Sequence, residues 1–179
     1  MVDIFLAEGF EEIEALCPLD LMRRAGIEVR TVGIGSKYIR GAHGICVEAD
    51  IVDSEYSYSS PDMVFLPGGM PGTLNLAASE VVTGAVKKAY AEGKYIAAIC
   101  AAPSILGDMG LLQGKEAICY PGFEDRLTGA KLSKARVVRD GKIITAAGMG
   151  AALDFGLLIV EVFCGAEKAA ALRAAVIAD

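Results

Sequence analysis

The sequence is poor in the residues from which most catalytic and metal centres are built. Histidine occurs once, as His43, in 179 residues. A Ser-His-Asp or Cys-His mechanism therefore has a single residue available as its base, and a centre made of several imidazoles is excluded. The single histidine also weakens any hypothesis of a metal site, and we expect neither a metal nor a cofactor.

The cysteines lack the pattern of a disulfide framework or a zinc site. There are five of them and no CxxC pair, and an odd number cannot pair completely within one chain. We expect four to serve as packing residues: Cys17, Cys46, Cys119 and Cys164. Cys100 differs because of its local sequence.

Excess positive charge and long apolar runs are also missing. The net charge is −6 and the basic residues are scattered, so we expect neither nucleic acid nor a membrane as partner, but a small-molecule substrate. No apolar run is long enough to cross a bilayer. The start of the chain lacks the basic and apolar regions of a secretory signal and reads directly as a strand, so we expect a cytoplasmic protein.

Apolar runs of strand length alternate with amphipathic segments of helix length. This alternation predicts an α/β fold over a single domain of residues 1–179, with a mostly parallel sheet between helices on both faces. The first helix should place Ile13, Cys17 and Leu21 on the core side. Asp140-Gly141 predicts a small β-hairpin. The expected strands are 2–7, 28–33, 45–47, 63–66 and 95–99, and the expected helices are 11–25, 79–92, 103–109, 151–163 and 167–178.

Cys100 lies where a buried strand runs directly into a helix. Ala98 and Ala102, two positions before and after it, are small, as in the G-x-S-x-G turn that exposes a nucleophile at the carboxyl end of a sheet. The following helix begins with Pro103 and directs free N–H groups at the thiol, which predicts a lowered pKa and a reactive thiolate. The alternative is an ordinary buried cysteine.

A glycine-rich loop follows another buried strand, in Leu66-Pro67-Gly68-Gly69-Met70-Pro71-Gly72. If this strand lies beside the one ending at Cys100, the amides of Gly69 and Ala101 could form an oxyanion site. A purely structural turn is the alternative.

Acidic residues cluster at the start of the first helix. Glu11 and Glu12 read as surface residues that complement the helix dipole. Glu14 lies on the same helical side as Pro18, whose missing N–H should kink the helix and could hold Glu14 toward the pocket.

Six segments resemble the ThiJ/PfpI superfamily, in the branch of the Parkinson-disease protein, which belongs to the class I glutamine-amidotransferase-like proteins. They are AEGFEEIEA (7–15), PLDLMRRAGIEV (18–29), VFLPGG (64–69), AAICAAPSIL (97–106), RVVRDGKIITAAG (136–148) and ALDFGLLIVE (152–161). The resemblance spans the chain in the right order. It implies a flavodoxin-like three-layer sandwich, a homodimer, Cys100 as the nucleophile, Glu14 as its hydrogen-bonding partner, and Gly69 and Ala101 as the oxyanion donors.

The chain departs from the family pattern at two positions. Tyr120 stands where some members have a histidine, and Met149 stands where relatives commonly have proline. His43 lies in a region that, in relatives, approaches the partner's active site, so the resemblance implies a contribution across a dimer interface. The alternative is a histidine in a surface turn. His43, Tyr120 and Gly68 are further candidates for the pocket wall.

These residues favour a cofactor-free glyoxalase III or deglycase acting on small dicarbonyls such as methylglyoxal. In this reading the Cys100 thiolate adds to the aldehyde and Glu14 moves protons. A redox-sensing protein that responds to oxidative stress through an oxidisable Cys100 is the main alternative. An amidase, a hydratase or an intracellular protease is disfavoured because Tyr120 replaces the histidine.

Overall fold

The computed structural model describes residues 1–57 and 60–178. A seven-stranded sheet forms its centre, in the order β10-β11-β7-β6-β1-β2-β5, and every pair in it is parallel except β10 with β11. Two pairs of short strands, β3 with β4 and β8 with β9, lie outside this sheet. The strands are β1 Val2–Leu6, β2 Val29–Gly33, β3 Tyr38–Arg40, β4 Cys46–Glu48, β5 Ile51–Val52, β6 Met63–Leu66, β7 Tyr95–Ile99, β8 Glu116–Ala117, β9 Lys131–Leu132, β10 Val137–Asp140 and β11 Ile143–Ala146.

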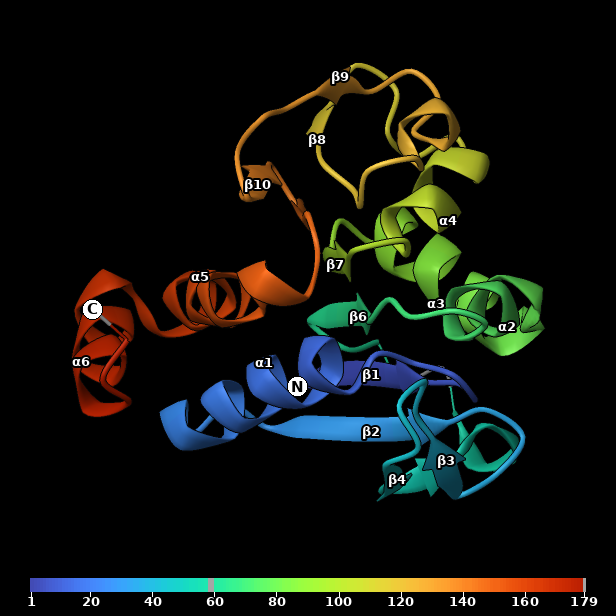
Figure 1. Cartoon of the computed structure of the whole chain (residues 1–179), viewed down its shortest axis with the longest axis horizontal. Helices are drawn as coiled ribbons and strands as arrows, with labels where there is room; N and C mark the ends of the chain where they lie inside the picture. Colours follow the sequence, from blue (N-terminus) through green and yellow to red (C-terminus); the bar gives the residue numbers. More distant parts are fainter. Residues whose placement is uncertain (58–59, 179) are drawn as a thin grey trace.

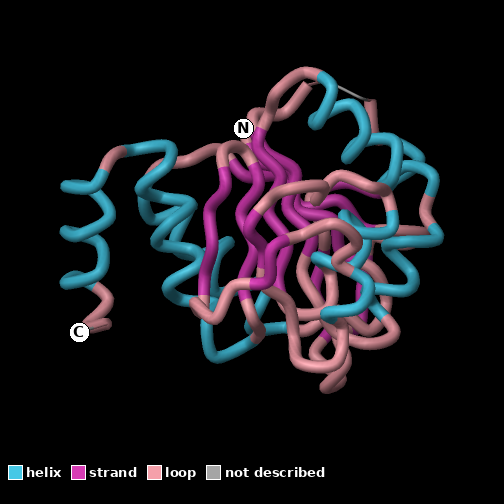
Figure 2. The backbone as a smooth tube through the Cα atoms, turned by 90° about the horizontal axis from the view of Figure 1, so that it is seen from above, coloured by secondary structure: helices cyan, strands magenta, loops and turns pink. Residues whose placement is uncertain are grey.

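Helices cover both faces of the sheet, which confirms the α/β sandwich (Figures 1 and 2). The first and fifth helices cover one face, with the sixth packed on their outer side, and the second, third and fourth helices cover the other face. No helix among the described residues combines the length and low charge that crossing a bilayer requires. The helices are α1 Glu12–Ala25, α2 Gly72–Ala78, α3 Glu80–Ala91, α4 Pro103–Asp108, α5 Ala152–Cys164 and α6 Ala166–Ala175.

Strands such as β6 are apolar throughout because both of their faces are buried. In β6, Met63 and Phe65 join the core beneath α1 and α5, while Val64 and Leu66 join the core beneath α3 and α4. Successive side chains of a strand point to opposite faces, so a strand covered on both sides favours apolar residues at successive positions. This pattern made the strands recognisable in the sequence.

Two expectations about side-chain position are wrong. Ile13 is exposed, because α1 buries the side containing Glu14, Ala15 and Pro18. Cys46 and Cys164 are exposed and do not pack in the core, whereas Cys119 is buried and Cys17 half-buried. The helix also continues through Pro18 to Ala25.

Asp3 is a buried charge at the middle of the sheet. Its carboxylate, which is fully buried, accepts hydrogen bonds from Arg30 Nε (2.9 Å), Arg30 Nη2 (2.8 Å) and the Tyr56 hydroxyl (3.0 Å). Asp3 and Arg30 lie opposite one another in the β1–β2 register. The parallel pairing of these strands thus brings the two charges together.

Removal of this carboxylate should destabilise the protein strongly. We expect Asp3→Ala to lower the free energy of unfolding by about 3 kcal/mol, since it leaves the Arg30 charge without its buried partner. Asp20→Ala is the control, because the Asp20–Arg24 pair is exposed and should contribute at most about 1 kcal/mol. Urea unfolding of both variants measures the difference, and equal midpoints would contradict the expectation.

Candidate active site

Cys100 occupies a strained turn at the carboxyl end of β7. Its φ is 65°, in the left-handed region that non-glycine residues rarely adopt, and Pro103 begins α4 just beyond it. The strand–turn–helix geometry inferred from the small neighbours is therefore present. The side chain is half-buried and remains partly open to solvent.

The glycine loop after β6 lies against this turn, because β6 and β7 are neighbours in the sheet. A Cβ atom added to Gly68 would lie 2.6 Å from Cys100 Cβ and 2.4 Å from Glu14 Oε2, so no other residue fits there. Gly69 has a φ of +91°. The N–H groups of Gly69 and Ala101 both donate to the Cys100 sulfur. These two predicted donors are thus brought together at the reactive atom.

Glu14 reaches the same point from the first turn of α1. Its carboxyl group hydrogen-bonds to the Cys100 thiol and accepts the N–H groups of Gly68 (3.1 Å) and Met149. Glu11 holds the end of this helix by accepting the Glu14 N–H at 2.7 Å. Glu14 is buried, so its position on the inner side of α1 accounts for its orientation toward Cys100. The orientation does not require the helix kink that we expected at Pro18.

Burial raises the pKa of Glu14 to about 7, even though its hydrogen bonds to Cys100, Gly68 and Met149 oppose that rise. The pKa of Cys100 is raised to about 12 by burial and by the ionised Glu14, against the Ala101 and Gly69 N–H groups. The prediction of a lowered pKa for Cys100 is therefore wrong, although the Ala101 N–H acts in the predicted direction. Both effects of Glu14 on the thiol belong to its ionised form, so the ionisation of the two groups is coupled.

This coupling means that the pair shares one proton above pH 7. A proton passed from the sulfur to Glu14 removes the nearby negative charge and leaves the thiolate with three donors: the Glu14 hydroxyl and the amides of Gly69 and Ala101. The Cys100 thiolate can therefore form only when Glu14 takes up the proton.

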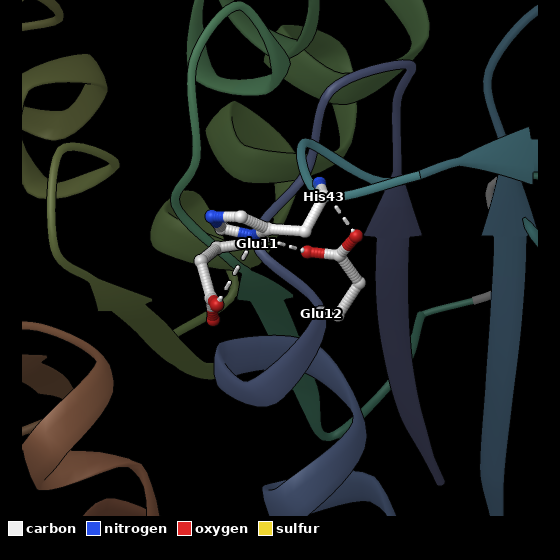
Figure 3. A group of neighbouring side chains, drawn as sticks. All are labelled: Glu11, Glu12 and His43. Atoms are coloured by element: carbon white, nitrogen blue, oxygen red, sulfur yellow. Dashed lines mark hydrogen bonds and ion pairs between the residues drawn. The ribbon is translucent and has the colours of Figure 1, made fainter. Parts of the chain in front are cut away.

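His43 lies against the beginning of α1, beside Glu11 and Glu12 (Figure 3). Its exposed ring has Nδ1 at 2.9 Å from Glu12 Oε2 and at 3.9 Å from Glu11 Oε1, and its backbone N–H donates to Glu12 Oε1 at 2.8 Å. The Glu12 side chain is only 2% exposed, so the expectation that it lies on the surface is wrong. The hydrogen bond to Glu12 raises the pKa of His43.

The ligand atoms of Glu11, Glu12 and His43 all lie within 4.8 Å of one another, which is close enough for a shared cation. Both Glu12 oxygens already accept hydrogen bonds from the 43–45 segment, however. These hydrogen bonds give Glu12 and His43 a structural role, because they connect the 43–45 segment to α1. No sequence pattern indicates this pairing, because it joins residues 31 positions apart.

Tyr120 and Met149, the two departures from the family pattern, lie beside the reactive pair. The Tyr120 N–H donates to the Cys100 carbonyl at 2.8 Å, and the Met149 N–H donates to Glu14. Both side chains are about half exposed. In the sequence Met149 was notable only as a difference from relatives. Its hydrogen bond to Glu14 uses the backbone N–H, which does not depend on the type of side chain, so the sequence could not indicate it.

The open α/β sheet defines a flavodoxin-like fold. Its candidate site consists of a cysteine on a strained strand-to-helix turn and a carboxyl group hydrogen-bonded to the thiol of that cysteine. The model of the DJ-1/PfpI family matches residues 1–162, and the chain belongs to this family.

Curated relatives support the assignment. The chain is 38% identical to the Parkinson disease protein 7 homolog of Danio rerio over 180 residues, which cover 97% of this chain and 95% of the relative. It is 32% identical to the glutathione-independent glyoxalase DJR-1.2 of Caenorhabditis elegans, over 90% of this chain and 87% of the relative. Against protein DJ-1 homolog B of Arabidopsis thaliana the identity is 38% over 92% of this chain, but the chain spans only 38% of that protein's length.

A solved structure agrees with the fold. Oxidized DJ-1 of Toxoplasma gondii superposes with a TM-score of 0.94 at 37% identity, covering 98% of this chain and 97% of that one. The predicted flavodoxin-like sandwich and the family resemblance are therefore confirmed.

Proposed function

We propose that this protein is a cofactor-independent enzyme that converts small 2-oxoaldehydes such as methylglyoxal to 2-hydroxy acids. The main observation is a half-buried thiol hydrogen-bonded to a carboxyl group whose pKa is raised to about 7. Such a pair can supply a nucleophile and a proton-transfer group at neutral pH. The name of the Caenorhabditis elegans relative, a glutathione-independent glyoxalase, supports the proposal.

The reaction begins with proton transfer from the Cys100 thiol to Glu14. The sulfur then adds to the aldehyde carbon: a C–S bond forms, the C=O π bond breaks, and the oxygen takes the proton from Glu14 to give a hemithioacetal. Glu14 is left as a carboxylate. The N–H groups of Gly69 and Ala101, which face the sulfur, stabilise the negative charge that develops on this oxygen.

Glu14 next moves a proton between the two carbons. As a carboxylate it removes the hydrogen from the former aldehyde carbon while the ketone oxygen takes up a proton, which gives an enediol. As a carboxylic acid it returns a proton to the former ketone carbon, and the hydroxyl on the sulfur-bearing carbon loses its proton to form the thioester C=O. The product is a thioester of a 2-hydroxy acid, which water hydrolyses to free acid and thiol. Methylglyoxal and water together give lactate, so no electron acceptor is needed. Removal of early glycation adducts from proteins would use the same groups.

Lactate formation from methylglyoxal in buffer without glutathione tests the proposal. The singly protonated pair is the active form, so kcat/KM should rise with pH through the raised pKa of Glu14, about 7, and level off above it. A rate no greater than that of buffer would contradict the proposal. A kcat/KM that falls as pH rises through 7 would contradict the assigned proton.

Oxidation of Cys100 is a second candidate, favoured by the Toxoplasma gondii DJ-1 structure, which is that of an oxidized protein. A protonated Glu14 could hydrogen-bond to a sulfinate at Cys100 and stabilise it. Mass spectrometry after mild peroxide treatment distinguishes the two. Selective oxidation at Cys100 in a protein without aldehyde turnover would favour the sensor, and equal oxidation of the exposed Cys46 would count against it.

We also propose that the protein acts as a homodimer on a small-molecule substrate. Exposed apolar side chains on α1 and on the β3–β4 segment, namely Ile13, Tyr38 and Ile45, support this proposal. The hydrogen bonds between Glu12 and His43 connect α1 to the β3–β4 segment and would fix the relative positions of these exposed apolar side chains. Light scattering after size exclusion measures the mass, and a monomer would contradict the dimer.

A further inference from the structure

A hollow of about 390 Å³ lies between the β11–α5 turn and the segment after β8. Its walls are predominantly apolar, and its volume lies in the range of small-molecule sites. The residues around it include Tyr120, Pro121, Ala147, Met149 and Ala151, with Arg136 at the rim.

Two residues that line the hollow also hydrogen-bond to Cys100 or Glu14, although neither member of the reactive pair lines it. Met149 lines it and donates its N–H to Glu14, and Tyr120 lines it and donates its N–H to the Cys100 carbonyl. A methyl group placed on Gly148 would lie 3.8 Å from Glu14 Oε1 and 3.2 Å from the Tyr120 ring. The hollow therefore lies next to the backbone segments that contact the reactive pair.

The chemistry of the walls favours an apolar occupant. Tyr120 and Met149 are 51% and 54% exposed, so both can bury further apolar surface when a group enters. Methionine adapts its shape and makes favourable contacts with aromatic rings. The rim guanidinium of Arg136 already donates to the Gly150 carbonyl and lies 3.8 Å from Asp154, so its charge is partnered by the protein itself.

We propose that this hollow binds the substituent on the ketone carbon of the substrate, and that the preferred substrates are 2-oxoaldehydes with a bulky apolar substituent, above all an aromatic ring. The inference rests on the proposed function and names its substrate class. The reaction itself is unchanged: the aldehyde carbon bonds to Cys100, and the substituent beyond the ketone carbon lies against Tyr120 and Met149.

The first test compares kcat/KM for phenylglyoxal, methylglyoxal and glyoxal. We expect phenylglyoxal to exceed glyoxal by about 10-fold or more, since even one methylene in an apolar pocket changes kcat/KM by about that factor. Met149→Gln, similar in length but polar, should reduce the phenylglyoxal-to-glyoxal ratio by about 10-fold. Met149→Leu, which keeps an apolar side chain of similar size, should retain the wild-type phenylglyoxal-to-glyoxal ratio. Ile177→Ala, at an exposed position near the C-terminus, is the control and should leave the ratio as in the wild type.

A second measurement needs no turnover. The rate of Cys100 alkylation by N-phenyl-iodoacetamide, divided by that of iodoacetamide, should exceed the same quotient for free cysteine by about 10-fold, and Met149→Gln should abolish the excess. In both reagents the sulfur displaces iodide, so only the substituent differs.

The outcomes separate the inference from the proposed function. Equal kcat/KM for glyoxal and phenylglyoxal, unaffected by Met149→Gln, would overturn the aromatic pocket and leave the glyoxalase intact. A preference for the phenyl reagent at Cys100 without turnover of any aldehyde would support the pocket and reject the glyoxalase. Absence of aldehyde turnover together with absence of a preference for the phenyl reagent would reject both the glyoxalase and the apolar pocket.

Discussion

Replacement of Cys100 by serine is expected to lower kcat/KM for methylglyoxal by at least about 10⁴-fold, the scale on which an enzyme loses activity with its nucleophile. The hydroxyl group is a far weaker nucleophile than the thiolate and cannot form the thioester. Serine preserves the size of the side chain in this tight turn, where φ is 65°. Lactate formation measured by coupled assay gives the rate.

Cys164→Ser is the matched control for this variant. Cys164 is exposed at the end of α5, away from the β7–α4 turn, so its replacement should leave kcat/KM unchanged. Circular dichroism of both variants checks that the fold is intact. Folded Cys100→Ser protein with wild-type activity would show that the chemistry takes place elsewhere.

Glu14→Gln is expected to lower kcat/KM by about 10²–10⁴-fold, the range that a positioned acid–base group contributes. Glutamine retains the shape of the side chain and can still accept the Gly68 N–H, but it cannot accept a proton from the thiol or from carbon. Addition of the aldehyde and the carbon-to-carbon proton transfer should therefore both slow down. The rise of kcat/KM near pH 7 should disappear with the group that causes it.

Glu167→Gln controls for the loss of a glutamate from the first turn of a helix. Glu167 lies in the first turn of α6 and is exposed, so its replacement should change neither the rate nor the pH profile. An unaltered pH profile in Glu14→Gln would assign the ionisation to another group, and His43 would be the next candidate because its pKa is raised by Glu12.

The sheet and the elbow could be predicted because their signals are local. Central strands such as β6 and β7 are apolar at successive positions, and the small residues around Cys100 mark a tight turn in the sequence itself. The hairpin of β10 and β11 was equally visible from Asp140-Gly141. Prediction of a single domain over residues 1–179 stays a prediction.

Other elements were missed because they are short or atypical. The strand β3 has only three residues, with Ile39 alone buried, which is too short for an alternating pattern. The helix α2 starts at Gly72 and contains no charged side chain, so its sequence resembles the glycine-rich loop before it. In α1 the apolar Ile13 was placed on the wrong side because the inner side also holds two glutamates.

The electrostatics of the site could not be predicted because they depend on contacts between distant segments. The burial of Glu12 depends on His43, and the pKa of Cys100 depends on Glu14, 86 positions away in the sequence and in another element. Local sequence showed only the helix that follows the thiol. Burial and the carboxylate outweigh that helix and leave the sulfur dependent on Glu14 for its ionisation.

The most direct test of this dependence is the pH profile of Cys100 alkylation by iodoacetamide, resolved from the other cysteines by peptide mass spectrometry, in wild type and Glu14→Gln. If the thiol gives its proton to Glu14, the wild-type rate rises through about pH 7, and the variant rises only at alkaline pH, toward or above the ordinary thiol value of 9.0. Coinciding profiles, or a wild-type thiol that reacts only above pH 9, would show that Glu14 does not ionise Cys100.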